Sequence, residues 1–194
     1  MKKELFLSDY YQKTSSCILS LQEEKYNVAK AANLILQTIK KNKNILVAGN
    51  GGSFSDAEHF ACELTCTFKD KRRAISAISI GSNAGSITAW SNDFGFETYF
   101  SRQVDALGKK NDILLLISTG GNPKGSSASL NLFHALKMGK KKKMKIISLV
   151  GKSGGRLKKE SDICIHVKSN ETSVIQEAHI TILHSICYLI DQNV

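Results

Sequence analysis

The chain has 194 residues, of which 42% are hydrophobic, and it contains one proline. These values are typical of one globular domain with a substantial core, and they exclude a disordered or low-complexity protein. The formal charge of +10 makes an anionic partner a hypothesis to weigh, either nucleic acid or a small metabolite. Residues 1–5 lead into a polar segment without a signal-peptide core, and no apolar run is expected to reach transmembrane length, so we expect a cytoplasmic protein without membrane contact.

Two helical patterns open the chain, at about residues 4–21 and 26–41, and the second carries a broad apolar stripe. Short apolar strands and helices then alternate to the end of the chain. The predicted strands lie at about residues 45–48, 74–80, 113–117, 145–149 and 163–167. The predicted helices between and after them lie at about residues 54–68, 82–91, 97–107, 126–138, 154–159 and 172–191. We therefore divide the chain into helices at 1–42 and an α/β region at 43–194, together forming one structural domain.

This alternation predicts an α/β fold of three layers, a doubly wound parallel sheet of five strands with helices on both faces. Ligands of such sheets bind beyond the carboxyl ends of the strands, where the strand order reverses. Two loops qualify: residues 49–53 after the first strand and residues 118–122 after the third. Both are rich in glycine and in hydroxyl or amide side chains, which is the chemistry of phosphate binding.

The helix after the first glycine loop carries His59 and Glu63 on one face, four residues apart. Such a pair is either an acid–base or metal-ligand pair, or an ordinary exposed helix pair. The loop lacks the third glycine of a dinucleotide fingerprint, and no lysine follows it as in a P-loop, so NAD and ATP are disfavoured. The layout favours a site for a small phosphorylated molecule.

The densest basic cluster, residues 140–143, is four lysines between a predicted helix that ends near Gly139 and a predicted strand. A lysine run at such a turn is typical of a solvated loop, and no aromatic residues interleave as a stacking surface for bases would require. Binding of nucleic acid is therefore disfavoured. The positive charge is at least as well explained by steering of an anionic metabolite.

The cysteines are odd in number and scattered. Cys62 and Cys66 share a helix face, but no second Cys or His pair at matching spacing accompanies them as a metal site would require. We interpret all five as reduced, structural core residues; they are Cys17, Cys62, Cys66, Cys164 and Cys187.

With these motifs in place, the chain resembles the SIS (sugar isomerase) domain family and, within it, the phosphoheptose isomerases. That family converts sedoheptulose 7-phosphate to glycero-manno-heptose 7-phosphate. The matching motifs follow one another in order at residues 49–53, 56–57, 59–61, 63–65, 92–96, 101–104, 117–119 and 175–180, and end with His184. The series spans about residues 45–190 and is specific.

The resemblance implies a homotetramer in which the N-terminal helices pack, active sites shared between subunits, and one Zn²⁺ per subunit. It implies that the zinc ligands are His59, Glu63, Gln176 and His184. It also implies a ketose–aldose conversion through an enediol, with Glu63 as the base and His184 as the acid. The substrate-binding positions that it implies are Asn50, Gly51, Gly52, Ser53, Glu63, Asn92, Asp93, Ser118, Thr119, Gly120 and Gln176.

The residues give this ligand set independent support. Gln176 and His184 are eight residues apart on the last helix, a little over two turns, so both can face one site. Four nitrogen and oxygen ligands suit zinc. His179 lies three residues from Gln176 and could be mistaken for a ligand, but the family match favours His184. A zinc-bound Glu63 would be a weaker base, and the sequence leaves that tension open.

The chain departs from the family pattern in two places. The second loop usually reads Ser-Thr-Ser-Gly-Asn-Ser, whereas Gly120 and Pro123 here replace two hydroxyl donors, and Lys124 offers a cation. Thr67 stands where the family tends to have arginine. These departures leave the exact sugar, and the lipopolysaccharide, capsule or other glycan it serves, open.

Two alternatives follow from these departures. One is a paralogous isomerase acting on a different sugar phosphate. The other is a non-catalytic SIS protein of the type that associates with the replication initiator DnaA. That type lacks the catalytic Glu and the final His, so the presence of Glu63 and His184 argues against it. A sugar-phosphate-sensing regulator would need a helix-turn-helix domain, for which the chain has no room.

Overall fold

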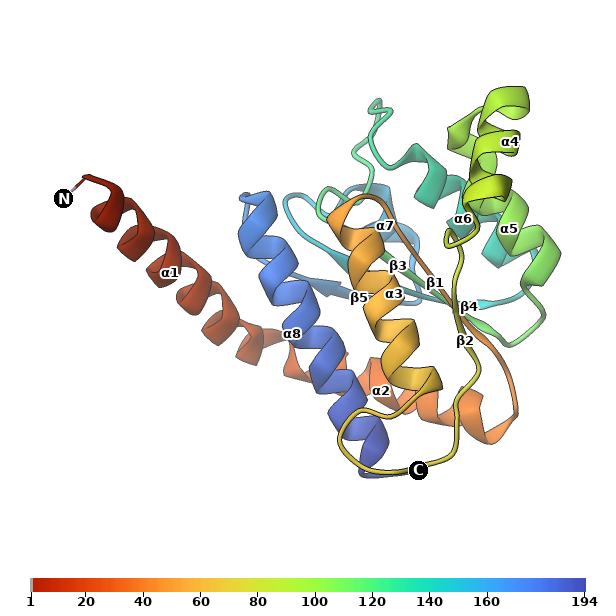
Figure 1. Ribbon diagram of the computed structural model, residues 1–194, viewed down its shortest axis with the longest axis horizontal. Helices are drawn as coiled ribbons and strands as arrows, with labels where there is room; N and C mark the ends of the chain where they lie inside the picture. The colour runs from red at the N-terminus through yellow and green to blue at the C-terminus, as the bar shows by residue number, and fades with distance from the viewer. Residues whose placement is uncertain (1) are drawn as a thin grey trace.

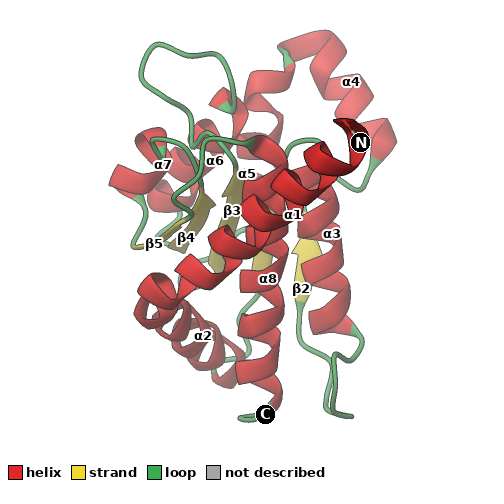
Figure 2. Ribbon diagram, turned by 90° about the vertical axis from the view of Figure 1, so that its left-hand side faces the viewer, coloured by secondary structure: helices red, strands yellow, loops and turns green. Residues whose placement is uncertain are grey.

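The computed structural model describes residues 2–194, and its five strands form one parallel sheet between two layers of helices (Figures 1 and 2). The strands are β1 (Ile45–Gly49), β2 (Ala77–Ser79), β3 (Ile113–Ser118), β4 (Lys145–Val150) and β5 (Ile163–His166). The α-helices are α1 (Lys2–Ser20), α2 (Lys25–Lys40), α3 (Gly52–Thr65), α4 (Ala84–Phe94), α5 (Tyr99–Leu107), α6 (Leu130–Lys141), α7 (Gly155–Glu160) and α8 (Thr172–Asp191). Two short 3₁₀ helices, η1 (Leu21–Glu24) and η2 (Phe96–Thr98), connect α1 to α2 and α4 to α5.

The strand order is β2-β1-β3-β4-β5, and all neighbours are parallel. The chain proceeds outward from β1 to β2 on one side and from β3 to β5 on the other. The strand order therefore reverses between β1 and β3, which pair along their full length from Ile45 and Ile113. Because these two strands are neighbours, the glycine loops that follow them emerge side by side at the same edge. This confirms the predicted fold class, and both glycine loops lie where ligands of such sheets bind.

Alternate strand residues build two separate cores. Val47 and Leu115 belong to the core formed with α2, α3 and α8, whereas Leu46 and Leu114 belong to the core formed with α5, α6 and α7. All four side chains are fully buried, and burying a Leu or Val side chain stabilises the fold by about 1.5–3 kcal/mol. A strand covered on both faces needs apolar residues at every position, which is why the strands read as continuous apolar runs.

Several boundaries differ from the sequence prediction by a few residues, and two of them have a clear physical reason. β2 is only three residues long, because it is an edge strand that pairs with β1 alone. Helix α6 continues to Lys141, so half of the lysine run lies in a last helical turn instead of in a loop. Positive side chains are favourable at a helix C-terminus. Neighbouring acids also balance part of the run, since Lys140 lies 3.4 Å from Glu160 and Lys142 lies 3.3 Å from Asp105.

Helix α8 corrects one expectation from the sequence. It is long and apolar enough, by length and composition alone, to cross a membrane, although no apolar run was expected to be. Half of that apolar stretch is buried within the protein, where α8 packs against α2, α3 and the sheet. The apolar character of α8 thus has an explanation as the core helix of this fold.

Candidate functional site

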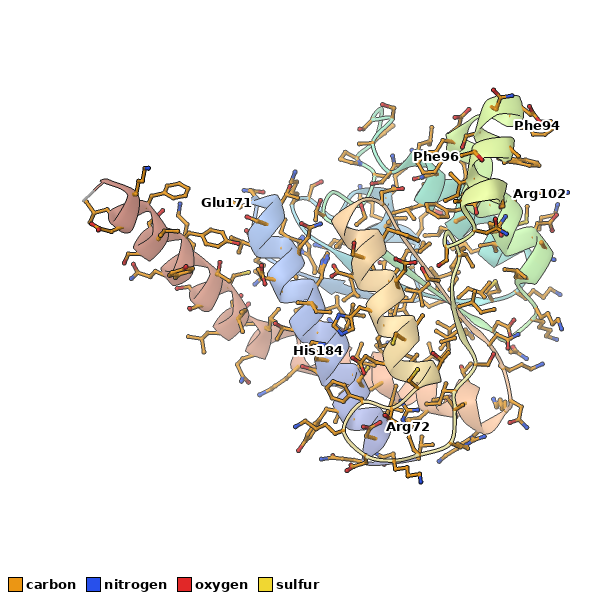
Figure 3. All side chains as sticks on the ribbon, in the orientation of Figure 1. Arg72, Phe94, Phe96, Arg102, Glu171 and His184 are labelled. Carbon is orange, nitrogen blue, oxygen red and sulfur yellow. The ribbon has the colours of Figure 1, made fainter. Side chains whose placement is uncertain are left out.

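His59, Glu63 and His184 come together between two neighbouring helices. His59 and Glu63 lie one turn apart on α3, and His184 faces them from α8 (Figure 3). The Nε2 atom of His59 lies 3.0 Å from Oε1 of Glu63 and 3.4 Å from Nε2 of His184. One nitrogen or oxygen atom of each residue lies within 4.8 Å of the other two. The structure therefore assembles three of the four predicted metal ligands.

The separation of the two imidazoles fits one divalent ion. Two nitrogens bound tetrahedrally to zinc, each at about 2.0–2.1 Å, lie about 3.4 Å apart. The Nε2 atoms of His59 and His184 have that spacing. Two imidazole nitrogens and one carboxylate oxygen form a ligand set typical of catalytic metal sites, which keep a further position open. The cluster can therefore hold a metal, and its carboxylate can accept a proton.

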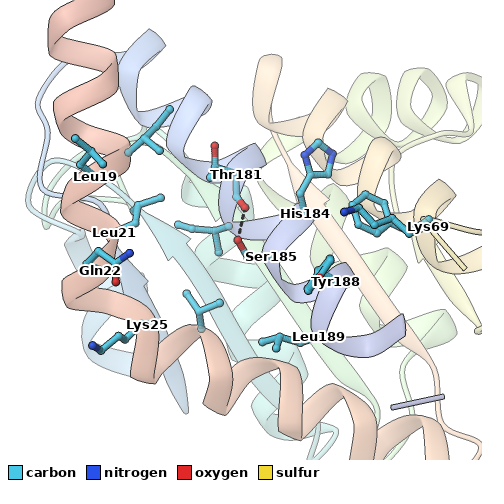
Figure 4. A pocket seen from close by; sticks show the side chains of 14 residues that line it. Leu19, Leu21, Gln22, Lys25, Lys69, Thr181, His184, Ser185, Tyr188 and Leu189 are labelled. Atoms are coloured by element: carbon cyan, nitrogen blue, oxygen red, sulfur yellow. Dashed lines mark hydrogen bonds between the residues drawn. The ribbon is translucent and has the colours of Figure 1, made fainter. Parts of the chain in front are cut away.

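Aromatic contacts fix the ring of His184. Phe68 stacks on it with ring centroids 5.5 Å apart and an interplanar angle of 25°, and His59 meets it edge-on at 5.0 Å. Beyond these rings, an open groove of about 700 Å³ runs along α8 toward the corner between α1 and α2 (Figure 4). Its lining is mainly apolar and includes Leu19, Phe68, Tyr188 and Leu189. His184 thus lies between the α3 side chains and this groove.

Arg72 ties together the ends of the two helices that carry the cluster. Its guanidinium donates hydrogen bonds to the backbone carbonyls of Glu63 at 2.6 Å and Leu64 at 3.0 Å, which lie in the last turn of α3. It also pairs with Asp191, the last residue of α8, at 2.7 Å. Asp191 in turn accepts hydrogen bonds from the backbone N–H groups of Lys69 and Asp70. The contact fixes α3 and α8 in register beside the cluster.

The first glycine loop brings backbone N–H groups to the start of α3. Gly51 has φ +56°, a conformation that favours glycine, and Gly49 has no room for a Cβ because the Ser53 carbonyl lies against it. Ser53 is buried. The side chains of Asn50 and Asn131 form two reciprocal hydrogen bonds of 2.9 Å. The amide of Asn50 is therefore engaged in joining this loop to α6.

Hydrogen bonds made by its own side chains hold the second glycine loop in shape. The hydroxyl of Ser118 accepts a hydrogen bond from the Gly121 N–H and contacts the Ser129 hydroxyl, both at 3.0 Å. Asn122 is fully buried, donates to the Ser126 and Ala128 carbonyls, and accepts from Arg156. A Cβ at Gly120 would meet nothing within 4 Å. The loop is therefore firmly shaped, with open space at Gly120.

Gln176, Asn92 and Asp93 are among the predicted site residues that lie away from the cluster within this chain. A Cβ at Gly52 would collide with the Gln176 amide, so this side chain lies beside the start of α3. His59 follows Gly52 by seven residues, about 10 Å along the helix axis. Gln176 thus lies beside the first glycine loop, and its role as the fourth metal ligand stays a prediction. Asn92 and Asp93 lie on α4, which packs mainly on η2 and α5. Figure 3 shows that end of α4, marked by Phe94, well apart from His184.

Two further groups on α3 have shifted pKa values. Burial raises the pKa of the Asp56 carboxyl to about 6, with His59 opposing and Glu177 adding to the shift. The neighbouring Cys66 thiol raises the pKa of the Cys62 thiol. Both cysteines are exposed, so the prediction that all five are core residues is wrong for this pair.

His179 lies outside the cluster. It is fully buried, and burial lowers the pKa of its imidazole to about 4. A neutral core histidine is consistent with the preference for His184 over His179.

Sequence reasoning missed the supporting residues of the site. Arg72, Phe68 and Asn131 act through contacts across long sequence distances, and no local spacing marks them. Asp56 stood within a recognised motif, three residues before His59, and its burial was the missing information.

The fold and this site define a class of protein. Residues 9–151 match the SIS domain family model, which is well over half of the chain. The chain belongs to the SIS domain family.

Similar proteins of known name identify the family within this class. The chain is 42% identical over 174 residues to the phosphoheptose isomerase of Helicobacter pylori, covering 90% of this chain and 88% of the relative. It is 43% identical over 168 residues to that of Campylobacter jejuni, covering 87% of each. The solved phosphoheptose isomerase of Francisella tularensis superposes with a TM-score of 0.92 at 32% identity, covering 100% of both chains. The chain therefore belongs to the phosphoheptose isomerase family.

Proposed function

We propose that this protein converts sedoheptulose 7-phosphate to glycero-manno-heptose 7-phosphate. The observation that carries the proposal is the Glu63 carboxylate held 3.0 Å from His59, with His184 opposite. Ketose–aldose conversion moves a proton between adjacent carbons, and it needs a base and an acid close to one carbonyl. The chain's membership of the phosphoheptose isomerase family supports this substrate and reaction.

In the mechanism, Glu63 removes the proton from the carbon next to the carbonyl and gives an enediol. His184 supplies a proton to the developing oxyanion, and stacking on Phe68 keeps its ring in place. The N-terminus of α3 and the second glycine loop bind the phosphate through backbone N–H groups, with Gln176 beside Gly52 positioned for the sugar. The phosphate thus anchors the substrate while its carbonyl end reaches the cluster.

The metal in this proposal is Zn²⁺, one per chain, held by His59, Glu63 and His184. When bound, Zn²⁺ would polarise the substrate carbonyl and stabilise the negative charge that develops on its oxygen. Gln176 is the fourth predicted ligand and stays a prediction. Because Glu63 contributes its Oε1 toward the cluster, its other oxygen is the one available to take the proton.

We propose that the working form is a homotetramer in the cytoplasm with active sites shared between subunits. Helix α1 extends away from the sheet (Figure 1) and exposes Leu5, Phe6, Tyr11 and Leu19, which favours contact with another copy. The apolar groove beside His184 is similarly uncovered. Asn92 and Asp93 lie far from the cluster in their own chain, so as substrate ligands they would act on a neighbouring site. The product would serve a heptose-containing surface glycan.

The alternative functions are a DnaA-associating SIS protein and an isomerase of another sugar phosphate. The first function needs neither Glu63 nor His184, yet both side chains lie within 4.8 Å of each other in the cluster with His59. The second remains the competing proposal, because Gly120 and Pro123 change the second loop.

The deciding experiment is incubation of the purified protein with sedoheptulose 7-phosphate, with and without added Zn²⁺, while the aldose is measured. Formation of the heptose 7-phosphate supports the proposal. Turnover of a different ketose phosphate, without turnover of this one, would favour the second alternative, and absence of any isomerisation would favour the first.

A further inference from the structure

Cys62, in the last turn of α3, and Cys66, directly after the end of α3, are exposed, free thiols. The Cys66 N–H donates to the Cys62 carbonyl at 2.9 Å, so the two residues are one helical turn apart. Their neighbours keep this turn in place, since the guanidinium of Arg72 holds the carbonyls of Glu63 and Leu64. The two thiols are therefore presented together on an anchored helix end.

This spacing suits a bridging atom better than a disulfide. Residues four apart on a helix have Cβ atoms about 5–6 Å apart. A disulfide needs Cβ atoms about 3.5–4.5 Å apart, so it would require the backbone around Cys66 to move. A metal-sized atom bonds each sulfur at about 2.3 Å and spans the gap while the helix stays intact. Soft thiolates select soft metal centres over hard ones.

We propose that Cys62 and Cys66 are a dithiol site that binds one soft, thiophilic centre, of the class of trivalent arsenic or Cd²⁺. With an arsenical of the type R–As=O, two S–H bonds break and two As–S bonds form. The two protons and the arsenic-bound oxygen leave as water, and no atom changes its oxidation state. Two thiols suffice for this reaction, so the site needs no third ligand.

The site would act on catalysis through its position, a consequence that rests on the proposed function. Cys62 directly precedes Glu63, and Cys66 follows Glu63 by three residues, which makes Cys66 and Glu63 neighbours on the helix surface. An atom bridging the thiols lies within about one turn of the Glu63 carboxylate. We expect it to obstruct the cluster and to inhibit isomerisation reversibly.

The remaining cysteines provide controls within the same chain. Cys17 and Cys187 are buried, and burial raises the pKa of both thiols, that of Cys187 to about 12. Buried thiols of this kind are inert. Cys164 is partly exposed on β5 and stands alone, so Cys164→Ser is the matched control for a single-thiol change.

The test uses the full-length reduced protein and phenylarsine oxide, which reacts with thiols and not with the histidine–carboxylate cluster. Intact mass spectrometry should find one arsenical per chain in the wild type and in Cys164→Ser. The adduct should survive excess 2-mercaptoethanol and be released by 2,3-dimercaptopropanol. Cys62→Ser and Cys66→Ser should each lower the affinity by about 100-fold or more, because linked contacts gain that factor over single ones.

A wild type that takes up no arsenical, or single variants that bind it as tightly as the wild type, would overturn the proposal. Because uptake is measured by mass, it stands apart from activity. Binding without inhibition would overturn only the effect on Glu63. An enzyme inactive before treatment would count against the proposed function and leave the dithiol test valid.

Discussion

Arg72 and Asp191 form a buried ion pair, 2.7 Å between Nε and Oδ1, with side chains only 3% and 2% exposed. The pair joins the loop after α3 to the last residue of α8, the two helices that carry the cluster. Because Arg72 also holds the final carbonyls of α3, it couples the backbone at Glu63 to the helix of His184. The alignment of His59 and His184, which are 125 residues apart in the sequence, is therefore supported by a contact at the C-terminal ends of both helices.

Replacing Arg72 should destabilise the whole fold. Arg72→Met leaves the buried Asp191 without its opposite charge, and breaking a buried ion pair in this way costs about 3–5 kcal/mol. We expect the urea midpoint of unfolding to fall and metal affinity to fall with it. Lys71→Met, an exposed neighbour on the same loop, is the control and should change stability little. An unchanged midpoint in Arg72→Met would show that the pair does not hold the two helices.

The same ion pair predicts that the free energy of unfolding depends on pH in the acid range. Burial alone would raise the pKa of Asp191, but hydrogen bonds from Lys69, Arg72 and Asp70 outweigh it and lower the pKa. A carboxyl whose pKa is lowered by folding stabilises the protein above its unfolded pKa of about 3.9, and this stabilisation is lost as pH falls through the folded value. Asp191→Asn should therefore flatten the acid limb of unfolding free energy against pH. An identical limb in both proteins would contradict this assignment.

Glu63→Gln should abolish isomerisation and leave the protein folded. The substitution removes the proposed base, and a positioned acid or base contributes about 10²–10⁴-fold to rate. Turnover of sedoheptulose 7-phosphate and the circular dichroism spectrum are the two measurements. Glu58→Gln, an exposed carboxylate on the same helix, is the control and should retain activity. Near-normal turnover in Glu63→Gln would remove Glu63 from the mechanism.

Metal analysis should find about one zinc per chain, bound by the histidines and carboxylate of the cluster. His184→Ala should lower zinc occupancy and rate together, because it removes both a ligand and the proposed acid. His134→Ala is the matched control, since His134 instead contacts the Glu97 carbonyl. Full activity in a thoroughly metal-free preparation would rule out an essential metal.

Much of the fold was predictable because its signals are local. Apolar runs mark the buried strands, and the two glycine loops fall at the carboxyl ends of β1 and β3. His59 and Glu63 were predictable as a pair because the helix period fixes their relation.

What the sequence could not show concerns burial and long-range contact. Helical spacing allowed Gln176 to face His184, but it did not show that the amide lies beside Gly52. Asn50 was predicted to bind substrate, and spacing did not show that its amide pairs with Asn131, 81 residues further on. Cys62 and Cys66 were assigned to the core from an apolar context, although their face of α3 is directed outward. Spacing alone does not show what lies opposite a side chain.

The altered second loop gives the last prediction. The Gly120→Ser, Pro123→Ser double variant should lower KM for the heptulose phosphate with less effect on kcat. A remote phosphate, untouched by the chemistry, is held nearly equally in ground and transition states. Each added hydrogen bond to a charged group improves binding by about 1.5–3 kcal/mol. The structure accommodates the change, since a Cβ at Gly120 meets nothing within 4 Å and Asn122 anchors the loop between the two positions.

Lys124→Gln separates the two explanations of an unchanged KM. If the double variant behaves like the wild type and Lys124→Gln raises KM, Lys124 already supplies the phosphate contact that the serines would provide. If neither change affects KM, the second loop does not bind the phosphate, and the first loop at the start of α3 must do so alone. Should the wild type ignore heptulose phosphate while isomerising another sugar phosphate, Gly120 and Pro123 mark a change of substrate. The same loop variants should then be assayed with that sugar phosphate. A change in KM is expected there, because the loop contacts the phosphate of the sugar that this site binds.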